Sequence, residues 1–308
     1  MIKTISLIIF AVTFSTPLSV LAQEVPRIQI GEGQKEFPES VTSISDGTLF
    51  TGSITQGVVF KVAPGAEQSE LFIAAPTDGP AGSFGVYADE ANGALWVCYA
   101  DPAVFGGGEA LPSVLAAYDL ATGEKRLAAT FPAGSLCNDI ATLPDGTAFA
   151  ADTASGRIIR VAAGSGVAEE WLSDPLLAGV DGLSFGPDGV LYVNSVTSHK
   201  LLRIELGPDG AAGPISELAT SEPLKGPDGM RFGSDGKLYL AENANGRVVE
   251  VTIEGDTATI RPLPGPAYNG ATAVTIVDDR LYVLETKLSA MGEDTDPGPF
   301  FIYTVPLN

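Results

Sequence analysis

The chain has 308 residues, of which 38 are acidic and 17 are basic, and its formal net charge is −21. So acidic a surface repels phosphate backbones and anionic lipid, which excludes nucleic acid and the membrane as expected partners. A single histidine and two cysteines exclude a multi-histidine metal centre and a disulfide framework. Chemistry in this chain therefore depends on carboxylates and amides, which are also groups that can hold an ion.

Residues 1–22 are predicted to be a secretory signal peptide. Lys3 precedes the apolar run Ile5–Val12, and small or short residues stand near Ala22, where a peptidase would cut. An N-terminal membrane anchor is the alternative, although the run is short and interrupted for a span. We expect a periplasmic or secreted protein whose residues 23–308 form one domain. Export would permit one disulfide, but the sequence does not show whether Cys98 and Cys137 meet.

The rest of the chain is rich in Gly and Pro and has alternating apolar runs without a long helical period, which indicates an all-β protein. Similar hairpins, such as "DIATLPDGTAFAAD" and "GLSFGPDGVLYVNS", recur roughly every 43 to 53 residues. Their six turns lie at Asp46, Asn92, Asp145, Asp188, Asp235 and Asp278.

A period in the forties with about four short strands per repeat is typical of a β-propeller blade. We predict a six-bladed β-propeller with four-stranded blades around a central channel. The chain ends on "FFIYTVPLN", so the last blade lacks an outer strand that "PRIQI" near residue 28 could supply to close the ring. A β-sandwich is the rival architecture.

Polar side chains with oxygen atoms occur at four of the six positions that lie seven residues before a turn, where each innermost strand should begin. The residues at this position are Glu39, Gly85, Asn138, Asp181, Asp228 and Ala271. Innermost strands line the channel of a propeller, so equivalent positions should face one another at one depth. Turn formation alone could explain any single Asp or Asn, but it does not demand a shared register.

Three carboxylates and an amide brought together in this way would suit a cation. Unpaired carboxylates repel one another and their pKa values rise, and a bound cation relieves this. Oxygen ligands without His or Cys suit Ca²⁺ first and Mg²⁺ or Mn²⁺ next, while Zn²⁺ is tolerated rather than selected. The predicted ligands are Glu39, Asn138, Asp181 and Asp228.

Two long loops, 100–113 and 286–300, follow the second strands of their hairpins. They should border the mouth of the channel at the end where the predicted ligands lie. We interpret them as lids, with flexible insertions as the alternative. Their apolar side chains, Phe105, Leu111, Met291 and Phe300, favour a substrate less polar than a free sugar lactone.

Other reactive side chains are predicted to be structural. His199 falls on this rim and is interpreted as a solvated turn residue rather than a proton shuttle. Ser195 and Ser198 lie near it, but no nucleophile elbow surrounds them. Cys137 should point away from the channel if Asn138 points into it, because side chains alternate along a strand.

Four motifs resemble those of the gluconolactonase and senescence-marker-protein (regucalcin) family of six-bladed propellers. They are "PES" at 38–40, "CND" at 137–139, "VDGL" at 180–183 and "PDGM" at 227–230. The resemblance implies that Glu39, Asp181 and Asp228 bind one divalent ion. It also implies that Asn138 contacts the substrate and that Asp228 is the general base of lactone hydrolysis.

The chain departs from the family pattern at two positions. Asp181 stands where the family usually has Asn, which keeps an oxygen ligand and adds a charge. Leu136 stands where some members have an Arg that contacts sugar acids, which argues against polar aldonolactones. The sequence therefore predicts a metal-dependent hydrolase that acts on a small lactone or ester. A non-catalytic propeller that binds a small ligand or a protein partner, with a structural ion, is the alternative, and a lyase or isomerase is a third option.

Overall fold

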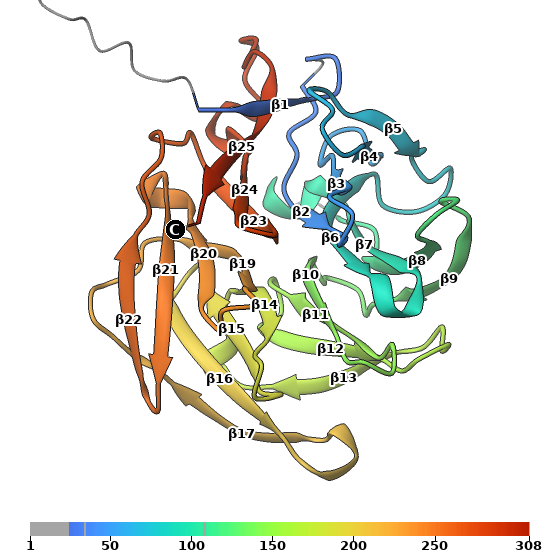
Figure 1. Cartoon of the computed structure of the whole chain (residues 1–308). Helices are drawn as coiled ribbons and strands as arrows, with labels where there is room; N and C mark the ends of the chain where they lie inside the picture. The colour runs from blue at the N-terminus through green and yellow to red at the C-terminus, as the bar shows by residue number, and fades with distance from the viewer. Residues whose placement is uncertain (1–24, 34, 107–108, 308) are drawn as a thin grey trace, which may run out of the picture.

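The computed structural model describes residues 25–33, 35–106 and 109–307. Within these residues the regular elements are β-strands and short 3₁₀ turns, and the strands form six sheets arranged in a ring (Figure 1). The predicted all-β, six-bladed propeller is confirmed. The predicted signal peptide lies outside the described residues. No helix among the described residues is long and apolar enough to cross a membrane.

Each blade is a four-stranded antiparallel sheet. Blade 1 is β2 (Val41–Ser43), β3 (Leu49–Gly52), β4 (Val59–Val62) and β5 (Glu70–Ile73), and blade 2 is β6 (Gly82–Asp89), β7 (Ala94–Ala100), β8 (Val114–Asp119) and β9 (Lys125–Thr130). Blade 3 is β10 (Cys137–Thr142), β11 (Ala148–Asp152), β12 (Arg157–Val161) and β13 (Ala168–Ser173), and blade 4 is β14 (Val180–Phe185), β15 (Leu191–Ser195), β16 (Lys200–Leu206) and β17 (Ala212–Glu217). Blade 5 is β19 (Pro227–Phe232), β20 (Leu238–Glu242), β21 (Arg247–Glu254) and β22 (Thr257–Pro262), with β18 (Ala219–Thr220) parallel to its edge. Blade 6 is β23 (Ala271–Val277), β24 (Arg280–Glu285), β25 (Phe300–Pro306) and β1 (Arg27–Ile30).

The aspartates of the hairpin turns explain why the chain reverses where it does. In blade 1 the Asp46 carboxylate accepts the N–H of Thr48 at 2.8 Å, and Gly47 between them has φ 92°. Blade 3 repeats this arrangement, with Asp145 accepting from Thr147 at 2.9 Å. An Asx turn followed by a left-handed glycine fixes the reversal locally, which is why the repeat is legible in the sequence.

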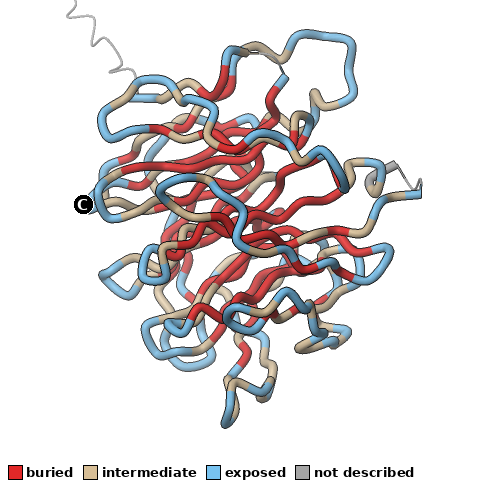
Figure 2. The backbone as a smooth tube through the Cα atoms, turned by 90° about the vertical axis from the view of Figure 1, so that its right-hand side faces the viewer, coloured by how far each residue is buried: buried red, intermediate tan, exposed pale blue. Residues whose placement is uncertain are grey.

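The ring closes as predicted, because the N-terminal strand completes the last blade. β1 pairs antiparallel with β25, and Ile28 lies opposite Ile302. Joining both ends of the described chain in one sheet leaves no blade without its outer strand, which limits exposed sheet edges. Buried residues follow the strands through the middle of the molecule, and exposed residues gather in the loops (Figure 2).

The innermost strands form a closed circle, in which β2, β6, β10, β14, β19 and β23 each contact the next. All of these strands except β2 carry a β-bulge close to their start. A bulge places two residues opposite one and re-aims a side chain, and bulges are common next to active sites. The bulge residues include Asn138, Asp181 and Asp228.

The bulges also bring neighbouring blades into close backbone contact. A Cβ atom on Gly85 would lie 1.8 Å from the carbonyl oxygen of Asn138, and one on Gly229 would lie 2.8 Å from that of Thr272. Glycine is therefore the residue that fits these positions. The strand pairing makes Phe84 and Thr272 the equivalents of Asn138, so the predicted equivalents Gly85 and Ala271 are each wrong by one residue.

Cys98 and Cys137 form a disulfide, with their Cα atoms 5.3 Å apart. The bridge joins the second strand of blade 2 to the innermost strand of blade 3, at the residue before Asn138. Both cysteines are fully buried. The structure thereby answers a question that the sequence left open, and it confirms Cys137 as a structural residue.

Candidate metal centre

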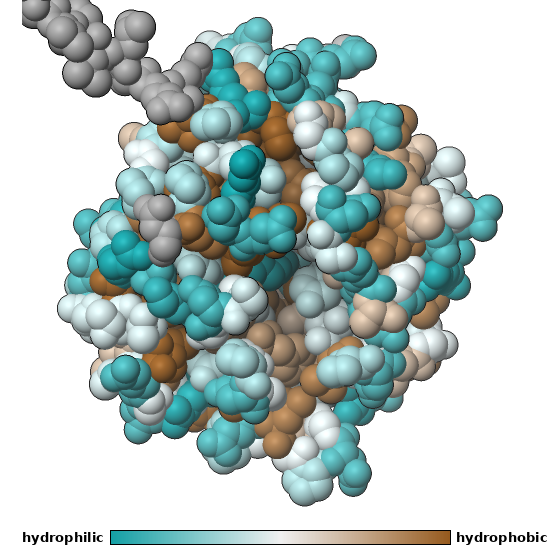
Figure 3. Space-filling view, viewed as in Figure 1, coloured by the Kyte–Doolittle hydropathy of each residue, from teal (hydrophilic) through white to brown (hydrophobic). Residues whose placement is uncertain are grey.

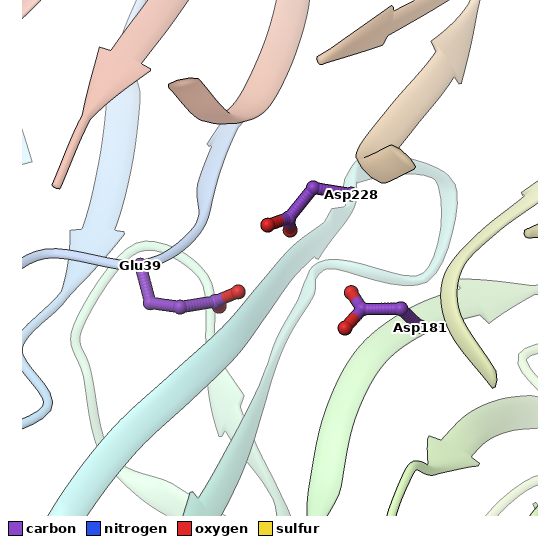
Figure 4. Close-up of side chains that lie close together, drawn as sticks. All are labelled: Glu39, Asp181 and Asp228. Carbon is purple, nitrogen blue, oxygen red and sulfur yellow. The ribbon is translucent and has the colours of Figure 1, made fainter. Parts of the chain in front are cut away.

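Three carboxylates converge at one end of the innermost strands. Glu39, Asp181 and Asp228 come from blades 1, 4 and 5, and their carboxylates point toward one another (Figure 4). One oxygen from each lies within 4.8 Å of the others. All three residues are buried, with 5–8% of their surface exposed. The shared register predicted from the turns does bring these three residues together.

Asn138 lies beside the three carboxylates and completes a group of four, which we call the acidic cluster. Its Nδ2 donates to Asp181 Oδ2 at 2.9 Å. The amide oxygen of Asn138, Oδ1, and the second carboxylate oxygen of Asp181, Oδ1, are buried without a hydrogen-bond partner among the described residues. Orphaned buried acceptors are costly unless something satisfies them. A hard cation would do so, and the oxygen-only donor set suits Ca²⁺ or Mg²⁺.

Asp228 is the most firmly held member of the acidic cluster. Its Oδ1 accepts the N–H of Gly229 at 2.9 Å, and its Oδ2 accepts from Asn243 Nδ2 at 3.1 Å. Its carbonyl oxygen accepts from Asn194 Nδ2 at 2.6 Å. Asn194 in turn accepts the N–H of Gly182 at 3.2 Å, which links Asp228 to the strand that carries Asp181.

Sequence reasoning missed both asparagines that support Asp228. Asn243 begins the 3₁₀ turn η5 (Asn243–Asn245), directly after β20. It follows a second strand, as the two long loops at the mouth do, and that position is the sequence signal that could have identified it. Asn194 sits in a second strand, where nothing in the repeat marks it.

Burial controls the protonation of the acidic cluster in the cation-free chain. It raises the pKa of Glu39 and of Asp181 well above their ordinary values, and the neighbouring carboxylates, Asp228 first, raise both further. Burial also raises the pKa of Asp228, to about 7, while the donors Asn243 and Gly229 oppose the rise. Without a cation, some of these groups must hold protons near neutral pH. A bound cation would replace these protons and relieve the repulsion between the carboxylates.

The two long loops start at the mouth. Loop 100–113 begins with η2 (Pro102–Gly106), and loop 286–300 contains η6 (Leu288–Ala290). Lys287 Nζ donates to the carbonyl oxygens of Pro297 and Pro299 at 3.0 and 2.7 Å, which fastens the second loop to itself.

The predicted apolar side chains of these loops have different surroundings. Leu111 is half exposed, and Met291 packs against the hydrophobic core. Phe300 is not part of a lid, because it starts β25 and is buried against Phe37, with ring centroids 5.0 Å apart. The side chain of Phe105 lies outside what the structure describes. Figure 3 shows the opposite face of the ring, at which β25 ends, and hydrophilic and hydrophobic residues both border its central hollow.

The serine and histidine side chains do not form a catalytic pair among the described hydrogen bonds. Ser195 Oγ donates to the carbonyl oxygen of Ala178 at 2.7 Å, and it accepts the N–H of Ser198. His199 is exposed, and its Nδ1 accepts the N–H of Gly226 at 3.1 Å. The histidine therefore supports the segment that leads to Asp228 and lies outside the acidic cluster.

Comparison with known proteins identifies relatives of this architecture. The sequence model described as "SMP-30/Gluconolactonase/LRE-like region" matches residues 37–286. A search of curated protein sequences finds no significant match.

Solved structures with the same fold have low sequence identity. A gluconolactonase from Xanthomonas campestris is 17% identical with a TM-score of 0.63, and covers 91% of this chain and 88% of its own. A luciferin-regenerating enzyme is 14% identical with a TM-score of 0.65, and covers 93% of this chain and 94% of its own. A virginiamycin B lyase from Staphylococcus aureus is 15% identical with a TM-score of 0.63, and covers 92% and 89%. Identities this low support the fold alone.

Proposed function

Because the chain belongs to the SMP-30/gluconolactonase/LRE-like family, we propose that it is a divalent-cation-dependent hydrolase of lactones or esters. The observation that carries the proposal is the acidic cluster, in which three buried carboxylates meet beside Asn138 and two of the oxygens, Asn138 Oδ1 and Asp181 Oδ1, lack a hydrogen-bond partner among the described residues. We propose Ca²⁺ as the ion, because the donors are all oxygen. We also propose a periplasmic or secreted location, which the predicted signal peptide supports.

Glu39, Asp181 and Asp228 would hold the ion, and the orphaned Oδ1 of Asn138 offers a fourth oxygen. A bound divalent cation would supply Lewis-acid polarisation of the substrate carbonyl. Asp228 would take a proton from water, because its two donors fix the direction of its carboxylate. Asn138, fixed through its bond to Asp181, would orient the substrate. Burial of the cluster would limit access of bulk water.

The surroundings support a less polar lactone or an ester rather than a sugar lactone. Leu136 is a buried apolar residue two positions before Asn138, where an arginine would contact a sugar acid. Val104 and Leu288, from the two long loops, pack against the hydrophobic core near the mouth. Apolar pocket walls favour apolar parts of a substrate.

A second candidate function is a non-catalytic propeller in which the ion is structural. The nearly complete burial of the acidic cluster favours it, because a plug needs no open ligand position. The two candidates differ in the expected effect of removing the ion. An enzyme loses turnover, and a plug loses thermal stability without ever showing turnover.

The test is Ca²⁺ titration calorimetry on metal-stripped protein, beside Asp228→Ala and the control Asp209→Asn. Asp209 is exposed, lies in the surface turn η4 (Pro208–Gly210) and has φ 60°, which Asn tolerates. Saturable binding to the wild type and the control, with loss in Asp228→Ala, is the expected result. Turnover of lactone and ester panels with and without EDTA then separates the two candidates. Absence of Ca²⁺ and Mg²⁺ binding in the wild type would overturn the proposal.

A further inference from the structure

A buried ion pair lies across the channel next to the acidic cluster. Arg231 of β19 donates its Nη1 to Asp139 Oδ2 at 2.8 Å and its Nη2 to Asp139 Oδ1 at 2.9 Å. Asp139 belongs to β10, so the pair joins blades 5 and 3, which are not neighbours in the ring. The two side chains are 12% and 6% exposed. A bidentate arginine–carboxylate pair fixes geometry as well as charge.

The same guanidinium group contacts two further blades. Arg231 Nη1 also donates to the carbonyl oxygen of Leu183 in blade 4 at 3.1 Å. Its Cζ lies 5.3 Å from the ring centroid of Tyr87 in blade 2. Asp139 Oδ2 accepts the N–H of Leu183 at 2.9 Å. One side chain thus joins the innermost strands of four blades across the channel.

The two residues of this ion pair, and the Leu183 backbone that they contact, are each close in sequence to a member of the acidic cluster. Asp139 directly follows Asn138, Leu183 comes two residues after Asp181, and Arg231 comes three residues after Asp228. The pair therefore holds the three strands that carry those members. It also affects the cluster through charge, because Asp139 raises the pKa of Glu39 and Arg231 lowers it.

We propose that Arg231 is a positioning residue that, through its forked contact with Asp139, sets the separation of the cluster oxygens and so the affinity and size selectivity for the cation. The inference rests on the proposed function. Outer-shell partners of ligating groups typically contribute 10–100-fold to metal affinity. Selection between Ca²⁺ and Mg²⁺ depends on the size and rigidity of the oxygen cage. Loosening the strands should therefore weaken Ca²⁺ binding and reduce the preference for Ca²⁺ over Mg²⁺.

Two variants separate the geometry of Arg231 from its charge. Arg231→Lys keeps the positive charge and loses the forked contact. The double variant Asp139→Asn/Arg231→Gln removes both charges together, so that no unpaired buried charge threatens folding. Asp209→Asn is the surface control. Calorimetry with Ca²⁺ and with Mg²⁺, together with thermal unfolding of the cation-free proteins, provides the measurements.

We expect the dissociation constant for Ca²⁺ to rise roughly 10-fold or more in both variants, with a smaller ratio of the Mg²⁺ to the Ca²⁺ constant. Lower melting temperatures with unchanged Ca²⁺ constants would show a merely structural pair and overturn the inference. Wild-type affinity in Arg231→Lys would show that charge alone matters, which also overturns it. If the wild type binds neither ion, the proposed function itself fails, and that outcome is distinct from the other two.

Discussion

Replacement of Asp228 by Asn is expected to stabilise the cation-free protein near pH 8, although it removes a proposed ligand. Burial raises the pKa of Asp228 from its ordinary value of 3.8 to about 7. Above pH 7 the native protein must keep this carboxylate charged without an ion. The difference between the two pKa values corresponds to about 4 kcal/mol of unfolding free energy. Asn is neutral and retains an acceptor for the N–H of Gly229. The variant should therefore gain up to about 4 kcal/mol of unfolding free energy.

The pH dependence of this gain has a definite sign. The pKa of Asp228 is higher in the folded than in the unfolded protein, so the folded state binds more protons between about pH 4 and pH 7. The stability of the cation-free wild type should fall across this window as pH rises. The variant should lack that part of the fall. The two proteins should therefore be similar near pH 4 and differ most near pH 8.

Urea unfolding of EDTA-treated wild type, Asp228→Asn and Asp209→Asn at a series of pH values measures these free energies. Addition of Ca²⁺ should reverse the order, because only a protein that binds the ion gains stability from it. A variant that is no more stable than the cation-free wild type near pH 8 would refute the reasoning from burial. A gain of equal size near pH 4 would refute the assignment to charge.

Three further predictions concern the parts that hold the acidic cluster. Replacing Cys98 and Cys137 by Ser opens a loop with a sequence separation of 39 residues, so urea titrations should show an unfolding free energy lower by about 4 kcal/mol. Equal stability of this variant and the wild type would contradict the prediction. Gly85→Ala forces the backbone of blade 3 to move, so calorimetry should show weaker Ca²⁺ binding together with a lower melting temperature; wild-type values in both would show that the close contact is unimportant. Asn243→Ala removes a donor that lowers the pKa of Asp228, so Ca²⁺ binding should weaken about 10-fold and require a higher pH; an unchanged pH profile would contradict this role.

The repeat and the four members of the acidic cluster could be predicted because both depend on local signals. Asp-Gly turns fix the start of each hairpin, and a constant offset from them identifies Glu39, Asn138, Asp181 and Asp228. The offset failed at Gly85 and Ala271, where the strand pairing shows Phe84 and Thr272 instead. Counting from the turn assumes hairpins of equal length. The hairpin of blade 2 holds the 3₁₀ turn η1 (Glu90–Asn92), so the count does not transfer to it.

Contacts that join different blades could not be predicted, because no local pattern encodes them. The disulfide depends on how blade 3 is placed against blade 2. The pair of Asp139 and Arg231 joins residues 92 positions apart in blades that meet only across the channel. Neither residue stands seven positions before a turn, so the repeated offset does not identify them.

The β-bulge of β10 explains how two consecutive residues, Asn138 and Asp139, can both reach the channel, one in the acidic cluster and the other in the ion pair. In a regular strand Asn138 and Asp139 would point to opposite faces, and only one of them could reach the channel. The bulge in β10 places both residues opposite a single step of β11. Asn138 then reaches Asp181 in blade 4, while Asp139 reaches Arg231 in blade 5. The equivalent positions in blades 4 and 5 are Gly182 and Gly229, whose added Cβ atoms would lie 2.4 and 2.8 Å from the next blade's carbonyl oxygens. Blade 3 is thus the one of these three in which the second bulge residue carries a side chain, and that side chain receives the arginine that ties the cluster-bearing strands together.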